Sequence, residues 1–142
     1  MNAHSPMNSI RQMTLADVPK WIALAKERYP GRDVGGMIGW VEWCITSPDR
    51  LVLVGSASVG IAAVGLNYGI ERRGRLEVLY TIPRLNPGLE ALAMVELMVR
   101  WAKGRGAEGK FDVDPDTNVD FGPFVRRLGG GPASNVRYEI PY

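Results

Sequence analysis

Residues 75–103 read RLEVLYTIPRLNPGLEALAMVELMVRWAK. Residues 76–82 are rich in β-branched, aromatic and aliphatic side chains and are followed by Pro83, which is typical of a strand covered on both faces. Asn86 can cap a helix whose first position is Pro87, and Glu90 places a carboxylate in the first turn, where the helix dipole favours it. The stretch therefore predicts a buried strand, a tight turn and a long helix.

The predicted helix, residues 89–103, carries few polar side chains. After Glu90 they are Glu96, Arg100 and Lys103, which form one narrow polar stripe. The rest of the helix surface must then be buried, and this set includes Leu92, Val95, Leu97, Met98, Val99 and Trp101. We expect a central helix that packs on a sheet and ends at Gly104.

Composition limits the class of protein. The chain has 142 residues, of which 46% are hydrophobic and 23% charged, and this suits one globular domain with its own core. A formal net charge of +2 is too small to indicate a nucleic-acid partner. One cysteine, Cys44, excludes an internal disulfide bond, and one histidine, His4, leaves no set of zinc ligands. No apolar run is long enough to cross a membrane and no signal peptide is recognisable, so we expect a cytoplasmic protein with no membrane partner. Because the zinc ligands are lacking, we also expect no metal site.

The rest of the chain predicts a series of short elements. Residues 1–8 form an N-terminal arm that is flexible or bound to a partner, and residues 9–142 form a single domain. Thr14 and Asp17 are spaced like a capping box at the start of a helix that ends near residue 30. We expect strands at 9–13, 50–55, 59–68, 110–113 and 136–140, a loop at 32–39, and short helices at 40–45 and 116–128. The strand at 110–113 should return through a right-handed crossover to lie parallel to its predecessor.

This order of elements resembles the GCN5-related N-acetyltransferase (GNAT) superfamily, and residues 9–27, SIRQMTLADVPKWIALAKE, are similar to its usual first strand and helix. The resemblance implies an α+β domain with a mixed, mostly antiparallel sheet of six or seven strands and about four helices on its faces. It also implies an acyl-CoA-dependent N-acyltransferase, weak or inactive if its motifs fail, that transfers an acetyl group from acetyl-CoA to a small-molecule or protein amine.

The cofactor motif of that family follows the strand that ends in V-x-P. It reads Arg/Gln-x-x-Gly-x-Gly/Ala, and its amides at a helix N-terminus hold the pyrophosphate of acetyl-CoA. Counted from Pro83, these positions fall on Asn86, Leu89 and Ala91, and only the last is kept. The resemblance implies a cofactor site at Leu79, Tyr80, Thr81, Ile82, Asn86, Gly88, Leu89, Glu90, Ala91 and Asn118. Because Pro87 has no amide proton and Asn86 can cap the helix itself, the alternative is a capped structural helix.

Residues 118–130 resemble the second motif of the family, N-x-x-A-x-x-φ-Y-x-x-x-G-F. Asn118, Phe124, Leu128 and Gly129 keep the register of the motif. Val125 stands where many members have the Tyr that protonates the departing thiolate, and Gly130 stands where they have Phe. The resemblance therefore places this segment beside the cofactor but supplies no acid for the leaving group.

A carboxylate on the fourth strand acts as the base in many members, and this makes Glu77 the candidate catalytic residue. The alternative is that Glu77 forms an ion pair with a neighbouring arginine. Trp40 and Trp43 would line the acceptor groove in the family, and otherwise they are core residues of a short amphipathic helix.

A function from a different class also remains open. Pro87, Leu89, Val125 and Gly130 each replace a family residue in a way that weakens cofactor chemistry but suits the fold. The protein would then be a noncatalytic GNAT-fold subunit of a larger assembly, for example of a phage or virus particle. It would bind protein partners through residues 1–8 and 136–142.

Overall fold

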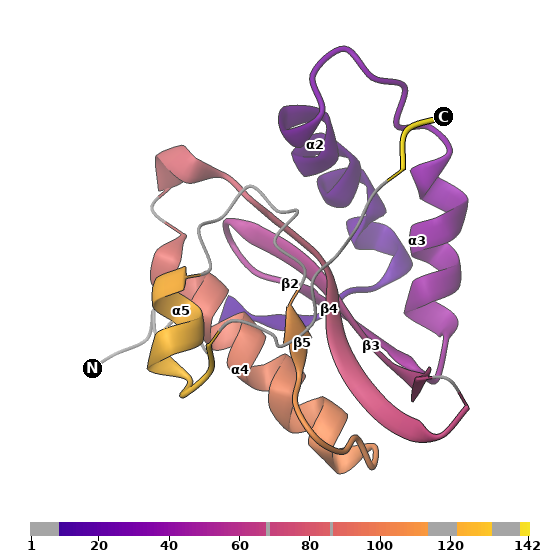
Figure 1. The fold of residues 1–142 in the computed structure, drawn as a ribbon. Coiled ribbons are helices and arrows are strands. Elements are labelled where there is room, and N and C mark those ends of the chain that lie inside the picture. The colour runs from indigo at the N-terminus through magenta and orange to yellow at the C-terminus, as the bar shows by residue number, and fades with distance from the viewer. Residues whose placement is uncertain (1–8, 68, 86, 114–121, 132–139) are drawn as a thin grey trace.

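A computed structural model of the chain describes residues 9–67, 69–85, 87–113, 122–131 and 140–142 (Figure 1). They form an α+β domain around one sheet with the strand order β1-β2-β3-β4-β5. The first four strands are antiparallel neighbours, and β5 lies parallel to β4. The strands are β1 (Arg11–Gln12), β2 (Arg50–Val54), β3 (Ser58–Asn67), β4 (Glu71–Thr81) and β5 (Asp112–Val113).

Helices lie on both faces of the sheet (Figure 1). One face is covered by α2 (Val18–Arg28) and α3 (Met37–Thr46), and the other by α4 (Gly88–Gly104). The remaining helical elements of the described residues are short: the 3-10 turns η1 (Leu15–Asp17) and η2 (Pro83–Leu85), and α5 (Gly122–Arg127). The long stretch of residues 75–103 thus supplies the middle of the fold, as expected, with β4 and α4 joined through η2.

The predicted count of six or seven strands is not matched, because the described residues form five. The predicted strand at 136–140 falls mainly on residues outside the described part of the chain, as do the arm 1–8 and the first part of the predicted helix 116–128. The expected loop at 32–39 was too long, because α3 already begins at Met37. The parallel return of β5 after α4 is confirmed.

The first helix begins as its capping pattern predicts. The Thr14 amide donates to Oδ2 of Asp17 at 2.9 Å, and η1 leads directly into α2. Arg11 of β1 holds the same carboxylate with two hydrogen bonds of 2.7 Å. Donation from Arg11, and then from the Thr14 amide, holds the pKa of Asp17 well below its usual range. The cap therefore also ties the start of α2 to the first strand.

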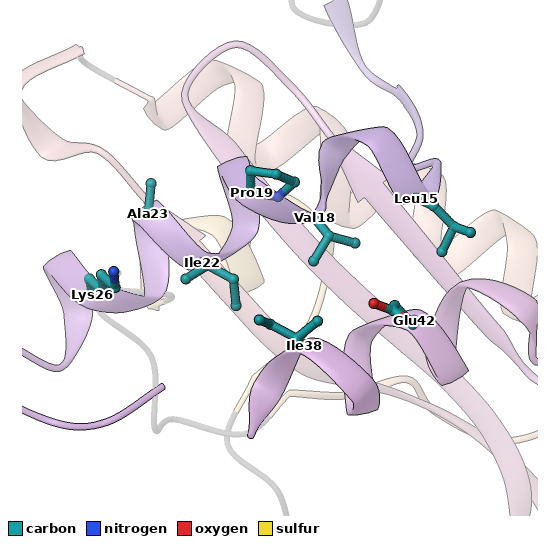
Figure 2. A pocket seen from close by; sticks show the side chains of 8 residues that line it. All are labelled: Leu15, Val18, Pro19, Ile22, Ala23, Lys26, Ile38 and Glu42. Atoms are coloured by element: carbon teal, nitrogen blue, oxygen red, sulfur yellow. The ribbon is translucent and has the colours of Figure 1, made fainter. Parts of the chain in front are cut away.

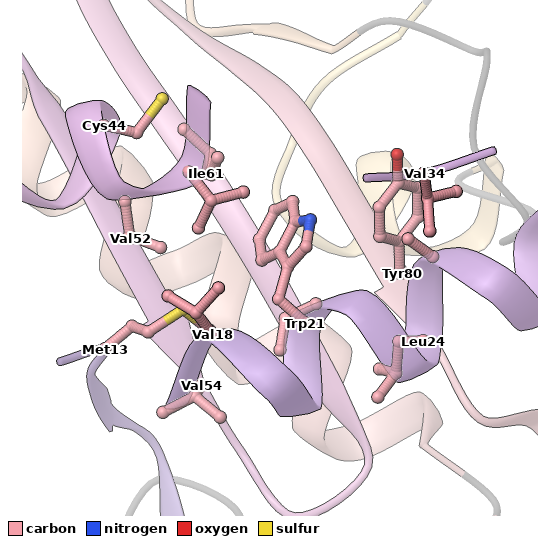
Figure 3. Close-up of a cluster of buried hydrophobic side chains, with 13 residues drawn as sticks. Met13, Val18, Trp21, Leu24, Val34, Cys44, Val52, Val54, Ile61 and Tyr80 are labelled. Carbon is pink, nitrogen blue, oxygen red and sulfur yellow. The ribbon is translucent and has the colours of Figure 1, made fainter. Parts of the chain in front are cut away.

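The first part of the core lies between the sheet and the α2/α3 layer (Figure 3). Trp21 is fully buried at its centre, and its ring meets the ring of Tyr80 edge to face with centroids 5.4 Å apart. Val41 and Cys44 are the residues by which α3 enters this core. The prediction that both tryptophans of α3 are core residues is wrong for Trp43, which is 52% exposed. Trp40 is half-buried against the core.

The second part of the core lies between the sheet and α4. The buried residues of the helix are Glu90, Ala91, Met94, Val95, Met98 and Ala102. Leu92, Leu97, Val99 and Trp101 are only half-buried, so the prediction of a helix buried everywhere except one stripe is wrong for these four. A single sheet can cover only one side of a helix, and the spacing of Ala91, Val95, Met98 and Ala102 selects that side. Small residues allow close packing here, since a Cβ at Gly60 would lie 2.7 Å from Cε of Met98.

Candidate functional site

The fourth strand carries a β-bulge at Glu77. Ile61 of β3 pairs with Val78 and the next residue, Ala62, pairs with Leu76, so Glu77 is the extra residue of β4. Leu76 packs into the core on the α4 side, whereas Val78 packs against the core on the α2/α3 side. A bulge of this kind redirects side chains locally. It places the Glu77 carboxylate on the α3 side of the sheet.

The Glu77 carboxylate is held by two arginines. Arg50 of β2 donates from Nη2 to Oε1 at 2.9 Å and from Nε to Oε2 at 3.3 Å. Arg75, two residues earlier on β4, donates from Nη2 to the same Oε1 at 2.9 Å. The Arg50 guanidinium also stacks over the Trp43 ring of α3, with Cζ 4.5 Å from the ring centroid. The side chain that the sequence marked as a base is therefore the centre of an ion-pair cluster, and Oε2 has only one of these donors.

The described pairing of β4 with β5 covers the two residues before the bulge. Arg75 pairs with Asp112 and Leu76 with Val113, and no described residue continues the pairing along Glu77–Thr81 on that side. The side chains of Leu79, Tyr80 and Thr81 are buried, and Ile82 is half-buried and donates its amide to the Ala57 carbonyl at 2.9 Å. This part of β4 therefore presents backbone rather than side chains to a ligand that lies along it.

The first turn of α4 follows at the end of the same strand. The amides of Gly88, Leu89 and Glu90 precede the first intrahelical bond, which the Ala91 amide makes to the Pro87 carbonyl at 2.7 Å. Gly88 is exposed, with open space where a Cβ would lie, and Leu89 is 64% exposed. The start of α4 is thus an accessible set of amide donors. Asn86 and Asn118, which the family resemblance placed beside it, lie outside the described residues.

The Glu90 side chain turns away from that set of amides and into the protein. Its carboxylate accepts hydrogen bonds from the turn between β2 and β3: the Ser56 hydroxyl at 2.6 Å, the Ala57 amide at 2.9 Å and the Ser56 amide at 3.1 Å. Burial alone would raise the pKa of Glu90, but these donors outweigh it, so the pKa lies below its usual value of 4.5. Within the predicted cofactor set, Glu90 can offer its amide while its carboxylate fixes the start of α4 to the sheet.

The Val125 side chain of α5 packs against the core on the α4 side. The Gly130 amide donates to the Val125 carbonyl at 2.8 Å and closes the end of α5. Val125 cannot donate a proton, so it supplies no acid for a leaving group.

The alternative prediction that Glu77 forms an ion pair with a neighbouring arginine is confirmed by Arg75, but sequence reasoning did not identify Arg50 as a second partner. Arg50 opens an apolar strand and Arg75 follows a charged turn, and each alone is ordinary for an exposed strand end. Ala63 of β3 pairs with Arg50 of β2 on one side and with Arg75 of β4 on the other, so the two arginines lie at the same level across the sheet. Only the strand order and the bulge at Glu77 join these residues, and neither can be read from local spacing.

A groove of about 610 Å³ opens elsewhere, between η1, α2 and α3 (Figure 2). It is lined by apolar side chains with one cation and one carboxylate: Leu15, Val18, Pro19, Ile22, Ala23, Lys26, Ile38 and Glu42. None of these residues belongs to the predicted catalytic or cofactor set. Its lining contains no Ser, Thr, Cys or His side chain, and burial raises the pKa of the nearby helix residue Cys44 to about 11, which keeps that thiol protonated.

Two further kinds of site are absent from the described part of the chain. Within it, no three His, Cys, Asp or Glu side chains cluster in a way that could hold a metal ion. None of its helices is both long enough and apolar enough to cross a membrane.

Comparison with solved structures gives the fold a precedent. An aminoglycoside antibiotic 6'-N-acetyltransferase from Acinetobacter baumannii is 18% identical, with a TM-score of 0.72 over 94% of this chain and 97% of its own. A predicted acetyltransferase from Clostridium acetobutylicum, solved with acetyl-CoA, is 15% identical, with a TM-score of 0.72 over 92% of this chain and 94% of its own. At such identities the likeness establishes the fold and leaves the chemistry to the residues of this chain.

A third structure matches over nearly the whole length. It is an integron cassette protein from the mobile metagenome of Cole Harbour Salt Marsh, 14% identical, with a TM-score of 0.77 over 99% of this chain and 95% of its own. No protein-family model and no curated protein matches the chain.

Proposed function

We propose, from the GNAT fold that this chain shares with those acetyltransferases, that the protein is an acyl-CoA-dependent N-acyltransferase that acetylates an amine. The observation that carries the proposal is the bulge of β4, which presents the Glu77 carboxylate between Arg50 and Arg75. The same strand leads through η2 to the accessible amides at the start of α4. A small-molecule amine is the acceptor class that the likeness to the aminoglycoside acetyltransferase favours.

The described residues fit acetyl-CoA at two places. The amides of Gly88, Leu89 and Glu90 lie at the accessible N-terminus of α4. The helix dipole and the N–H groups that have no intrahelical acceptor favour a pyrophosphate there. The backbone of β4 from Glu77 to Thr81 would lie beside the chain that links the pyrophosphate to the thioester. These residues would place the acyl carbon beside the bulge. Bound acetyl-CoA would supply an activated acyl group with a thiolate as its leaving group.

The chemistry at the bulge needs one base. The lone pair of the acceptor nitrogen attacks the thioester carbonyl carbon, a C–N bond forms, and the C–S bond breaks with its electrons on sulfur. The proton lost by the amine passes to Oε2 of Glu77, directly or through water, because Oε1 is engaged by both arginines. Val125 offers no proton, so the thiolate takes one from solvent.

Binding of acetyl-CoA is the first test of the proposal. We expect calorimetry to give a Kd below about 100 µM, which corresponds to roughly 5.5 kcal/mol of binding free energy. Leu89→Asp should weaken this binding by about tenfold or more, because a carboxylate would face the pyrophosphate. The same change should leave the melting temperature equal or slightly higher, since an acidic residue in the first turn of a helix is worth about 0.3–1 kcal/mol.

The matched control for this test is Leu66→Asp, which changes a leucine that is similarly exposed but lies on β3. It should leave the affinity for acetyl-CoA unchanged. No detectable binding by the unaltered protein at millimolar acetyl-CoA would reject the transferase and favour a noncatalytic protein with this fold.

The role of Glu77 is tested by Glu77→Gln. We expect kcat to fall about 10²-fold or more, because a general base typically contributes 10²–10⁴-fold, while the Kd for acetyl-CoA stays within about threefold. Glu71→Gln is the control, since Glu71 lies on the same strand and also accepts a hydrogen bond from an arginine, Arg73. A Glu77→Gln enzyme with the full rate would remove Glu77 as the base.

A further inference from the structure

We infer that the acyl acceptor is an amine that also carries a carboxylate, such as a small amino acid, and that Arg75 together with Arg50 binds that carboxylate. The inference rests on the proposed function and names the substrate class of the same site. It follows from the charges around the bulge, the donors left over there, and the position of Arg75 relative to Glu77.

The cluster at the bulge has one positive charge in excess. Arg50 and Arg75 share the single carboxylate of Glu77, and both use Oε1. The other two arginines of this end of β4 have three carboxylates between them, so the positive excess is confined to the Arg50, Glu77 and Arg75 side chains. Arg72 pairs with Asp49, and Arg73 pairs with both Glu71 and Asp112. Asp112 faces Arg75 in the strand register, but its Oδ1 accepts from Arg73 at 2.8 Å.

Arg75 has donors left over for a ligand. Only its Nη2 is engaged, and among the described residues its Nε and Nη1 have no partner. Its side chain is 53% exposed, so these donors are accessible. A guanidinium presents its donors in a planar fork that matches the two oxygens of a carboxylate.

Arg50 is the fixed member of the pair. Its Nε and Nη2 bind Glu77, its face is covered by the Trp43 ring, and its side chain is 18% exposed. Stacking on an aromatic ring and bidentate pairing remove most of the freedom of an arginine side chain. Arg50 therefore supplies a fixed positive charge, while Arg75 supplies the accessible donors.

The spacing suits a small bifunctional molecule. Arg75 and Glu77 lie two residues apart on one strand, so their Cα atoms are about 7 Å apart. An acceptor amine at Oε2 of Glu77 would then place a carboxylate on the same molecule within reach of Arg75. A purely cationic amine would add its charge to a cluster that is already positive, and a neutral amine would leave the Arg75 donors to water. The product on this inference is an N-acetyl amino acid that keeps its carboxylate.

The test compares L-amino acids with their C-terminal amides as acceptors of the acetyl group of acetyl-CoA, with released CoA thiol as the readout. We expect kcat/KM to be at least about tenfold higher for the acids, since loss of a charged hydrogen-bond partner at such a site costs a comparable factor. Arg75→Gln should remove this preference mainly through KM, and Arg75→Lys should restore part of it. Arg72→Gln is the control and should keep the preference.

The outcomes separate the inference from the proposed function. Equal or faster turnover of the amides, or an unchanged preference in folded Arg75→Gln protein, would overturn the inference. Acetyl-CoA binding with turnover only of cationic amines such as aminoglycosides would overturn it too, while leaving the acyltransferase in place. If acetyl-CoA does not bind at all, the proposed function and the inference both fall.

Discussion

Met98→Asp is expected to unfold the domain. Met98 is fully buried between α4 and the sheet. It packs so closely on β3 that a Cβ added at Gly60 would lie 2.7 Å from Cε of Met98. The buried polar residues of the described chain are Ser58, Thr81 and Glu90, with no arginine or lysine among them, so the new carboxylate would be buried without a cationic partner. An unpaired buried charge costs several kcal/mol, a large part of a typical stability of about 5–15 kcal/mol. Circular dichroism with thermal melting should show no cooperative transition.

The control for Met98→Asp is Arg100→Asp on the exposed side of the same helix. It should shift the free energy of unfolding by less than about 1 kcal/mol, as surface changes usually do. Val99→Asp should fall between the two, because Val99 is half-buried at the edge of the same core. A soluble Met98→Asp protein that melts cooperatively would contradict the assignment of this face to the core.

The main elements could be predicted from the sequence because their signals are local. The strand before Pro83, the helix that ends at Gly104 and the parallel return of β5 follow from apolar runs and helix punctuation, and all three are confirmed. The buried side of α4 was harder to predict, since apolar residues occur nearly all round it. Only the sheet, with glycines at residues 60 and 74 under the helix, decides that Met94 and Met98 face inward and Leu92 does not.

The site depends on tertiary contacts that local patterns do not encode. Glu90 matches a generic acidic residue in a first helical turn, but three of its donors come from a turn more than thirty residues earlier in the chain, and a fourth is the Ser9 hydroxyl at 3.4 Å. Trp43 matches a core position of a short helix, yet its ring covers the Arg50 guanidinium at the surface. In both cases the side chain has a partner that only the fold brings near.

Glu90→Ala is expected to have the second-largest effect on stability. Glu90 is 7% exposed, and its carboxylate accepts hydrogen bonds from two backbone amides and the Ser56 hydroxyl. Leaving the buried Ala57 amide without an acceptor costs about 1–3 kcal/mol, and losing the two hydrogen bonds from the exposed Ser56 costs about 0.5–1.5 kcal/mol each, so the loss should reach roughly 2–6 kcal/mol. Chemical denaturation should show this as a lower midpoint. Ser56→Ala removes only the hydroxyl and should cost about 1 kcal/mol.

The same contact predicts how stability depends on pH. Because the pKa of Glu90 is lower in the folded protein than its usual 4.5, the carboxylate stabilises the fold fully above that value, and this contribution is lost as pH falls through the folded pKa. Glu90→Gln should remove that part of the acid dependence, although the amide oxygen can still accept one hydrogen bond. Denaturation midpoints of both proteins between about pH 3 and pH 7 would measure the difference. Parallel pH profiles would show that Glu90 does not hold the turn between β2 and β3 as a carboxylate, and that the first turn of α4 is fixed to the sheet by apolar packing alone.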